Sequence, residues 1–172
     1  MKNLKIIFGL WLIISICSCE KIDYNDNNPD VENYIETLKL NLYDSLNLPS
    51  FTYKEIPTLL KYINETQTIS VFPRNPISSY YQLECKLGIY VLWTIESIRA
   101  VSINSESLVM NFPSQNSILS LKNVDELILV DNTESHEIAS KAYYDWWNNN
   151  KSRKFYKFKN IDPLKNTDYR WH

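Results

Sequence analysis

Residues capable of nucleophilic or metal chemistry are few in this sequence. The chain has three cysteines and two histidines among 172 residues. His136 precedes Glu137, but position 140 is serine, so the chain lacks the two-histidine spacing of a zinc protease. A serine nucleophile on a tight elbow would need flanking glycines, and the whole chain has 2 glycines. The sequence therefore predicts no metal site, no cofactor and no catalytic set.

Cys85 and the acidic residues are further candidates for chemistry. Cys85 lies between Glu84 and Lys86, whereas a reactive cysteine needs a neighbouring base and a lowered thiol pKa. We expect a buried, unreactive thiol there. With 20 acidic residues, carboxylate pairs such as Glu84 with Glu96 can also be proposed. A carboxylate pair in a cleft would make the chain a hydrolase or a glycan-processing accessory, which is the alternative function.

An aromatic run offers binding rather than catalysis. Tyr143, Tyr144, Trp146 and Trp147 follow one another closely in a predicted helix, so they cannot all face one side. We expect Tyr144 or Trp147 to be partly exposed, where such rings serve as interface residues or as platforms for sugars. Trp171 is a third candidate of the same kind. The other possibility is that the aromatic tail after residue 154 covers these rings.

The amino-terminal segment has the organisation of an export signal. Lys2 and Lys5 precede an apolar core at 6–16, which has the length of a signal-peptide core and is too short to span a bilayer. The motif Ile16-Cys17-Ser18-Cys19 resembles the lipobox of bacterial lipoproteins, in which an aliphatic residue and two small residues precede a cysteine. The resemblance implies cleavage before Cys19 and its acylation with chains such as palmitate; Cys17 departs from the usual small residue. An ordinary secretory signal or a buried helix is the alternative.

This reading of Cys19 sets the expected organisation and location. The chain would comprise a lipoprotein signal peptide at 1–18, a flexible tether at 19–30 and a single globular helical domain at 31–172. The tether "EKIDYNDNNPD" is polar and has no apolar period. Two or three acyl chains on one residue anchor a protein stably. We expect an outer-membrane lipoprotein, facing the periplasm or the surface, whose partners are the membrane and an envelope protein or glycan.

Charge argues against nucleic acid as a partner. The formal net charge is −2, so there is no basic excess to displace counterions from phosphates. One local basic cluster, "KSRKFYKFK", spans residues 151–159. We expect it to form a solvated face, and an anion site is the alternative.

Two further resemblances point to the Bacteroidetes. Asp44-Ser45-Leu46 is similar to the acceptor triplet for O-glycosylation in exported proteins of that group, which makes Ser45 a candidate modification site. The segments at 72–100, 142–151 and 161–172 resemble a family of small Bacteroidetes lipoproteins with a domain of unknown function. That resemblance implies a compartment and an anchor, and it supplies no activity.

Side-chain spacing predicts mostly helices. Pro29 follows a capping asparagine and starts a helix that should end near Asp44. The other helices are expected at 51–63, with Thr52 and Glu55 as a capping box, at 79–100, opened by Ser79 and Gln82, and at 133–151, capped by Asn132 or Thr133 with His136 at the surface. Because "LGIYVLW" is apolar nearly all round, the 79–100 helix should be central.

The predicted fold class is therefore mainly α. It is a compact bundle of about four to six helices around the central helix 79–100, with minor short strands. The predicted function is a lipid-anchored cell-envelope protein acting as a non-enzymatic binding or assembly module.

Overall fold

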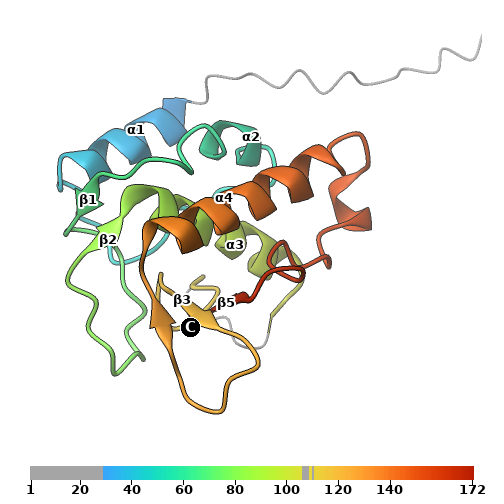
Figure 1. The fold of residues 1–172 in the computed structure, drawn as a ribbon. Helices are drawn as coiled ribbons and strands as arrows, with labels where there is room; N and C mark the ends of the chain where they lie inside the picture. Colours follow the sequence, from blue (N-terminus) through green and yellow to red (C-terminus); the bar gives the residue numbers. More distant parts are fainter. Residues whose placement is uncertain (1–28, 106–108, 110) are drawn as a thin grey trace, which may run out of the picture.

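The computed structural model describes residues 29–105, 109 and 111–172 (Figure 1). The helices are α1 (Pro29–Lys39), α2 (Ile56–Leu59), α3 (Leu87–Ser102), α4 (Thr133–Asn148) and a 3-10 turn, η1 (Phe155–Lys157). The strands are β1 (Thr68–Ile69), β2 (Cys85–Lys86), β3 (Leu119–Leu121), β4 (Leu129–Val130) and β5 (Tyr169–Trp171). The predicted signal peptide, Cys19 and the tether up to residue 28 lie outside the described residues.

Two small antiparallel sheets accompany the helices. Strands β1 and β2 pair with Ile69 opposite Cys85. In the second sheet β3 is central, with Leu119 opposite Val130 of β4 on one side and opposite Trp171 of β5 on the other. Figure 1 shows α4 lying across α3, with α1 and α2 at one end of the molecule and the β4–β3–β5 sheet at the other.

The predicted mainly-α bundle of four to six helices is wrong, because the fold is mixed α/β. The described residues form four α-helices, of which α2 is a single turn, and two antiparallel sheets. Each strand is two or three residues long, which is too short to show the alternating pattern by which a strand is recognised in a sequence. The partner of β3 on its other side, β5, lies far away along the chain, with Leu119 opposite Trp171, so local sequence carries little information about that pairing.

The central helix begins later than predicted. α3 starts at Leu87 instead of residue 79, and the residues before it run through a loop into β2. Arg74 holds that loop, because its guanidinium donates to the backbone carbonyl of Gln82 at 2.6 Å and to that of Leu83 at 3.2 Å. The Gln82 side chain reaches Ser117 instead of capping a helix. These long-range contacts outweigh the local capping pattern.

α3 forms the core of the fold. Its residues are buried nearly all round, including Tyr90, Trp93 and Ile95. Tyr34 of α1 is hydrogen-bonded to Thr94 at 2.8 Å between the two hydroxyl oxygens, which ties α1 to the central helix. In the described part of the chain, no helix is long and apolar enough to cross a membrane.

The ends of the other helices follow local chemistry. α1 begins at Pro29 as predicted but ends at Lys39 instead of near Asp44. Asn41 adopts a positive φ of 56°, and the amide of Leu42 donates to Thr37 at 2.8 Å, which closes the helix with a left-handed turn. α4 begins at Thr133, where the Asn132 side chain accepts from the Ser135 amide at 2.8 Å, as the capping prediction requires.

The predicted helix at 51–63 is reduced to α2, Ile56–Leu59. The Glu55 carboxylate does reach back to the amide of Thr52, at 2.6 Å, but the Thr52 hydroxyl donates to that same carboxylate at 2.8 Å. The Thr52 hydroxyl accepts from the amide of Lys54 at 3.3 Å, and the Glu55 amide donates to the Thr52 carbonyl oxygen at 3.2 Å instead of to the hydroxyl. The capping box is therefore incomplete, and a turn precedes the helix.

Gly88 lies at a close contact between α3, α4 and the segment after α2. A methyl group at this position would overlap the carbonyl oxygen of Ile63 and lie 2.5 Å from Nε2 of His136. The expected surface position of His136 is wrong, since its side chain is buried and its Nε2 lies 2.7 Å from the Ile63 carbonyl oxygen. Ser140 donates to the same oxygen at 2.9 Å. A glycine is needed there because any side chain would fill the space of these contacts.

Candidate functional site

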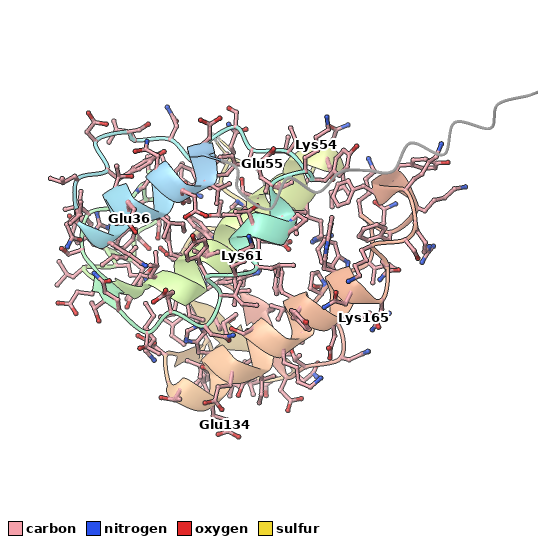
Figure 2. All side chains as sticks on the ribbon, turned by 90° about the horizontal axis from the view of Figure 1, so that it is seen from above. Glu36, Lys54, Glu55, Lys61, Glu134 and Lys165 are labelled. Carbon is pink, nitrogen blue, oxygen red and sulfur yellow. The ribbon has the colours of Figure 1, made fainter. Side chains whose placement is uncertain are left out.

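A groove of about 330 Å³ opens between α2 and the carboxyl-terminal half of α4. Figure 2 shows Lys61 on the side of α2 that faces α4. Aromatic, aliphatic, amide and ammonium groups line the groove, and none of the lining residues that the structure describes is acidic. The lining residues are Pro57, Leu60, Lys61, Tyr144, Trp147, Asn148 and Lys151.

Helical spacing places the α4 side of the groove on one face. Tyr144, Trp147, Asn148 and Lys151 stand three or four residues apart, which is the spacing of neighbours on a helix surface. Tyr144 is 54% exposed, whereas Trp147 is 5% exposed and forms an inner part of the wall. The structure thus brings together two of the three predicted binding residues.

Packing behind the groove holds Trp147 in place. Its ring lies 5.8 Å from that of Phe158 in an edge-to-face contact and 6.0 Å from that of Trp146. Phe158 follows η1 and is itself 1% exposed. The aromatic tail therefore covers the inner side of Trp147, as one of the two sequence hypotheses held, while Tyr144 stays exposed.

Trp171 lies elsewhere, in a buried polar cluster between α3, α4 and β5. Its indole Nε1 donates to the hydroxyl of Tyr143 at 2.8 Å, and that hydroxyl donates to the Glu96 carboxylate at 2.7 Å. Glu96 also accepts from Nε of Arg99 at 3.0 Å. Burial and the charge of Glu96 raise the pKa of Tyr143 well above its usual range, so the phenol stays protonated. This cluster joins three elements and commits Glu96 to structure.

The family of the chain is known from its sequence. A family model for a domain of unknown function, DUF4943, matches residues 25–172. The chain belongs to the DUF4943 family. The prediction of a domain of unknown function is thereby confirmed. Comparison with curated proteins and with solved structures gave no match.

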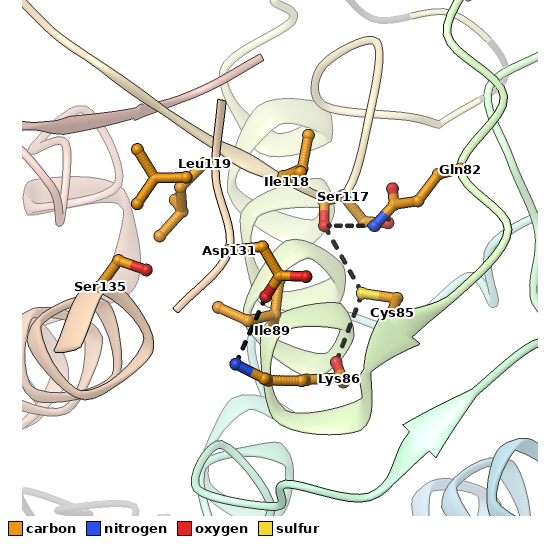
Figure 3. A pocket seen from close by; sticks show the side chains of 10 residues that line it. Gln82, Cys85, Lys86, Ile89, Ser117, Ile118, Leu119, Asp131 and Ser135 are labelled. Carbon is orange, nitrogen blue, oxygen red and sulfur yellow. Dashed lines mark hydrogen bonds and ion pairs between the residues drawn. The ribbon is translucent and has the colours of Figure 1, made fainter. Parts of the chain in front are cut away.

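The DUF4943 domain also contains a small cavity beside Cys85, of about 10 Å³ (Figure 3). Such a volume holds about one water molecule. Cys85 lies in β2, where its thiol donates to the carbonyl of Ser117 at 3.5 Å. Burial raises the pKa of the thiol to about 12, so it stays protonated and unreactive. Nearby, Lys86 pairs with Asp131 at 3.4 Å. Cys85 is buried as expected, although it precedes the helix.

Two other predicted features of the DUF4943 domain can be placed. Ser45 lies exposed in the loop between α1 and α2, and its hydroxyl accepts from the amide of Asn47 at 3.1 Å. The neighbouring Leu46 is 81% exposed, so an enzyme could reach this triplet. Across the described ranges, no group of three or more His, Cys, Asp or Glu side chains could hold a metal ion.

Sequence reasoning identified Tyr144 and Trp147 but missed Lys61 and the α2 side of the groove. Lys61 belongs to a segment that carries no aromatic run or charge cluster. Lys151 is the first residue of the basic cluster at 151–159, and the sequence does not connect it with Tyr144 and Trp147. These groups are brought together by the packing of α2 against α3 and by the contacts of Ile63, after α2, with His136 and Ser140 of α4.

Proposed function

We propose that this DUF4943 chain is a lipid-anchored cell-envelope protein that acts as a non-enzymatic binding module, with the α2–α4 groove as its binding site. The observation that carries the proposal is the composition of the groove. It combines an exposed tyrosine, a tryptophan and two lysines in about 330 Å³. Concave sites with aromatic walls and a few polar groups are typical ligand sites.

The same lining argues against the hydrolase alternative. General acid–base cleavage of a glycosidic bond needs a pair of carboxyl groups flanking the bond. The described part of the groove lining presents ammonium and amide groups instead, and Glu96 is occupied by Arg99 and Tyr143 in the core. The lysines and Asn148 can bind and orient a ligand, and binding is the activity that these groups support.

The position of the groove fits an anchored protein. Tyr62, the residue after Lys61, donates a hydrogen bond to the Glu32 carboxylate in the first turn of α1. The groove therefore lies beside the end of the domain where the tether begins. Residues 20–28 would span at most roughly 30 Å when fully extended. A lipid on Cys19 would keep the groove within reach of molecules at the membrane surface.

The anchor is tested by acylation of the protein in its native envelope. Cells expressing the full chain are fed an alkyne-tagged palmitate, and incorporation is compared between the wild type, Cys19→Ser and the matched control Cys17→Ser. We expect label and membrane association in the wild type and Cys17→Ser, and loss of both in Cys19→Ser. Labelled Cys19→Ser, or an unlabelled wild type, would refute the anchor.

The binding role is tested by affinity capture from solubilised native envelope. Tyr144→Ala is compared with Tyr81→Ala, because Tyr81 is also exposed, at 70%, and lies outside the groove lining. We expect the wild type and Tyr81→Ala to retain an envelope component that Tyr144→Ala loses, with no soluble product released during incubation. Equal retention by Tyr144→Ala would exclude the groove, and product release would favour the hydrolase.

A further inference from the structure

We propose that the domain carries a basic face that lies against the anionic head groups of the membrane. The basic face consists of Lys54, Arg153, Lys154, Tyr156 and Lys157, and these residues are not part of the described lining of the α2–α4 groove. Its ligand is the phosphate of phospholipid head groups. The inference rests on the lipid anchor of the proposed function, and it assigns the side on which the anchored domain meets the bilayer.

Positive charge is concentrated in residues 151–159, although the chain as a whole carries a formal net charge of −2. The stretch "KSRKFYKFK" contains five basic residues, and no acidic residue occurs between Asp145 and Asp162. The guanidinium of Arg153 donates to the side-chain oxygen of Asn150 at 2.7 Å. Because this acceptor is uncharged, the contact positions the arginine without neutralising its charge.

Lys154 and Lys157 present their charges to the solvent. Both are exposed, and neither forms an ion pair within the described part of the chain. Nζ of Lys157 lies 5.0 Å from the centroid of the Tyr156 ring, and Tyr156 is 59% exposed. Tyrosine is enriched at the head-group level of membranes, and clustered lysines bind anionic lipids there. The side chains around η1 therefore match the chemistry of a lipid surface.

A second segment extends the basic face. The ring of Tyr53 stacks on that of Phe155 in η1, with centroids 5.1 Å apart, and this contact brings Lys54 to the same end of the molecule. Figure 2 shows Lys54 at the outer edge of the molecule. The three exposed lysines of the face lie outside the described linings of both cavities. Charges spread over a surface without a pocket fit an extended anionic surface better than one small ligand.

The basic face lies near the point where the tether joins the domain. Tyr34, in the middle of α1, packs edge-to-face on Phe51 with ring centroids 5.5 Å apart, and Phe51 is two residues before Tyr53. The chain therefore enters the domain, at Pro29, on the side that carries the face. A lipid on Cys19 would hold this side toward the bilayer, where the lysines meet the head groups.

The test is acetylation of lysines in the protein purified from its native envelope and reconstituted in phosphatidylcholine vesicles with or without phosphatidylglycerol. Peptide mass mapping gives the acetylation rate of each lysine. We expect Lys54, Lys154 and Lys157 to react more slowly on the anionic vesicles than on the neutral ones, and added salt to remove the difference. Lys165, an exposed lysine outside the basic face, should react at the same rate on both.

A charge-removing variant tests whether the lysines cause the contact. Each lysine near an anionic surface strengthens binding about fivefold, so Lys154→Gln combined with Lys157→Gln should weaken the contact about thirtyfold. In this double variant Lys54 should react on anionic vesicles as fast as on neutral ones. The matched control Lys165→Gln should leave Lys54 protected. Protection of Lys54 that survives the double substitution would overturn the inference.

Flotation of the vesicles separates this inference from the anchor. A wild type that floats with both kinds of vesicle, but whose three lysines react equally on both, would overturn the basic face and leave the anchor intact. Flotation with anionic vesicles alone would overturn the anchor and support the basic face. Flotation with neither would overturn both.

Discussion

Replacing Gly88 by alanine should destabilise the fold strongly, although alanine normally favours a helix. The added methyl group would overlap the Ile63 carbonyl oxygen and lie 2.8 Å from that of Glu65. These are backbone atoms, so they cannot rotate away as the end of a side chain can. Either α3 or the segment after α2 must move, and His136 must leave its position 2.5 Å from the new atom.

The expected loss in the free energy of unfolding can be estimated from the contacts at this junction. Overpacking a tight site costs about 1–3 kcal/mol. The shift strains three hydrogen bonds: Gly88 N to Glu65 O at 2.9 Å, His136 Nε2 to Ile63 O at 2.7 Å, and Ser140 Oγ to Ile63 O at 2.9 Å. Each is worth about 0.5–1.5 kcal/mol. The higher helix propensity of alanine offsets about 1 kcal/mol of this loss. A net loss of about 1.5–6.5 kcal/mol in the free energy of unfolding follows, and the upper end requires that all three hydrogen bonds are lost.

Urea unfolding followed by tryptophan fluorescence measures this loss. We expect the midpoint for Gly88→Ala to fall while the slope of the transition stays constant. In a His136→Ala background the methyl group meets one fewer obstacle, so the two substitutions together should cost less than the sum of their separate effects. A Gly88→Ala protein as stable as the wild type, or more stable, would refute the close packing at this junction.

Three further predictions concern buried polar groups. Burial lowers the pKa of His136 below its usual 6.5, so at acidic pH the unfolded chain takes up a proton that the folded state excludes. The contribution of His136 to stability should be complete above pH 6.5 and should be lost as the pH falls toward the folded pKa. Urea midpoints measured against pH should fall less in His136→Gln than in the wild type. Cys85, with its pKa raised to about 12, should resist a thiol reagent at pH 8 until urea unfolds the chain, and peptide mass mapping would show early labelling if this is incorrect. Tyr143→Phe leaves Glu96 and Trp171 without their shared hydroxyl and should cost about 1–3 kcal/mol; an unchanged thermal midpoint would argue that the cluster is not structural.

The sequence predicted those features that depend on neighbouring residues. Pro29 starts α1 and Asn132 caps α4, because both effects act within one helical turn. The predicted start of the central helix was wrong. The observed start depends on Arg74, which binds the carbonyls of the preceding loop, and on the pairing of Ile69 with Cys85. Contacts between residues far apart in the chain are not encoded in local spacing.

The candidate site shows the same division. A closely spaced aromatic run on one helix identifies Tyr144, because a helix cannot bury adjacent side chains on one face. The contribution of Lys61 depends on how α2 packs, and the burial of His136 depends on the carbonyl of Ile63. Nothing in the sequence around Trp171 indicates that its indole donates a hydrogen bond to the Tyr143 hydroxyl.

Strand β5 has a consequence for how the chain reaches its final state. Residues 169–171 pair with β3, and the backbone of His172 exchanges hydrogen bonds with Asn116 and Ile118. The middle of the chain must therefore wait for these late-synthesised residues before the sheet is complete. A nonsense mutation that removes only the segment from Tyr169 onward should behave like a severe folding defect, and proteases of the cell's quality control should clear the shortened product.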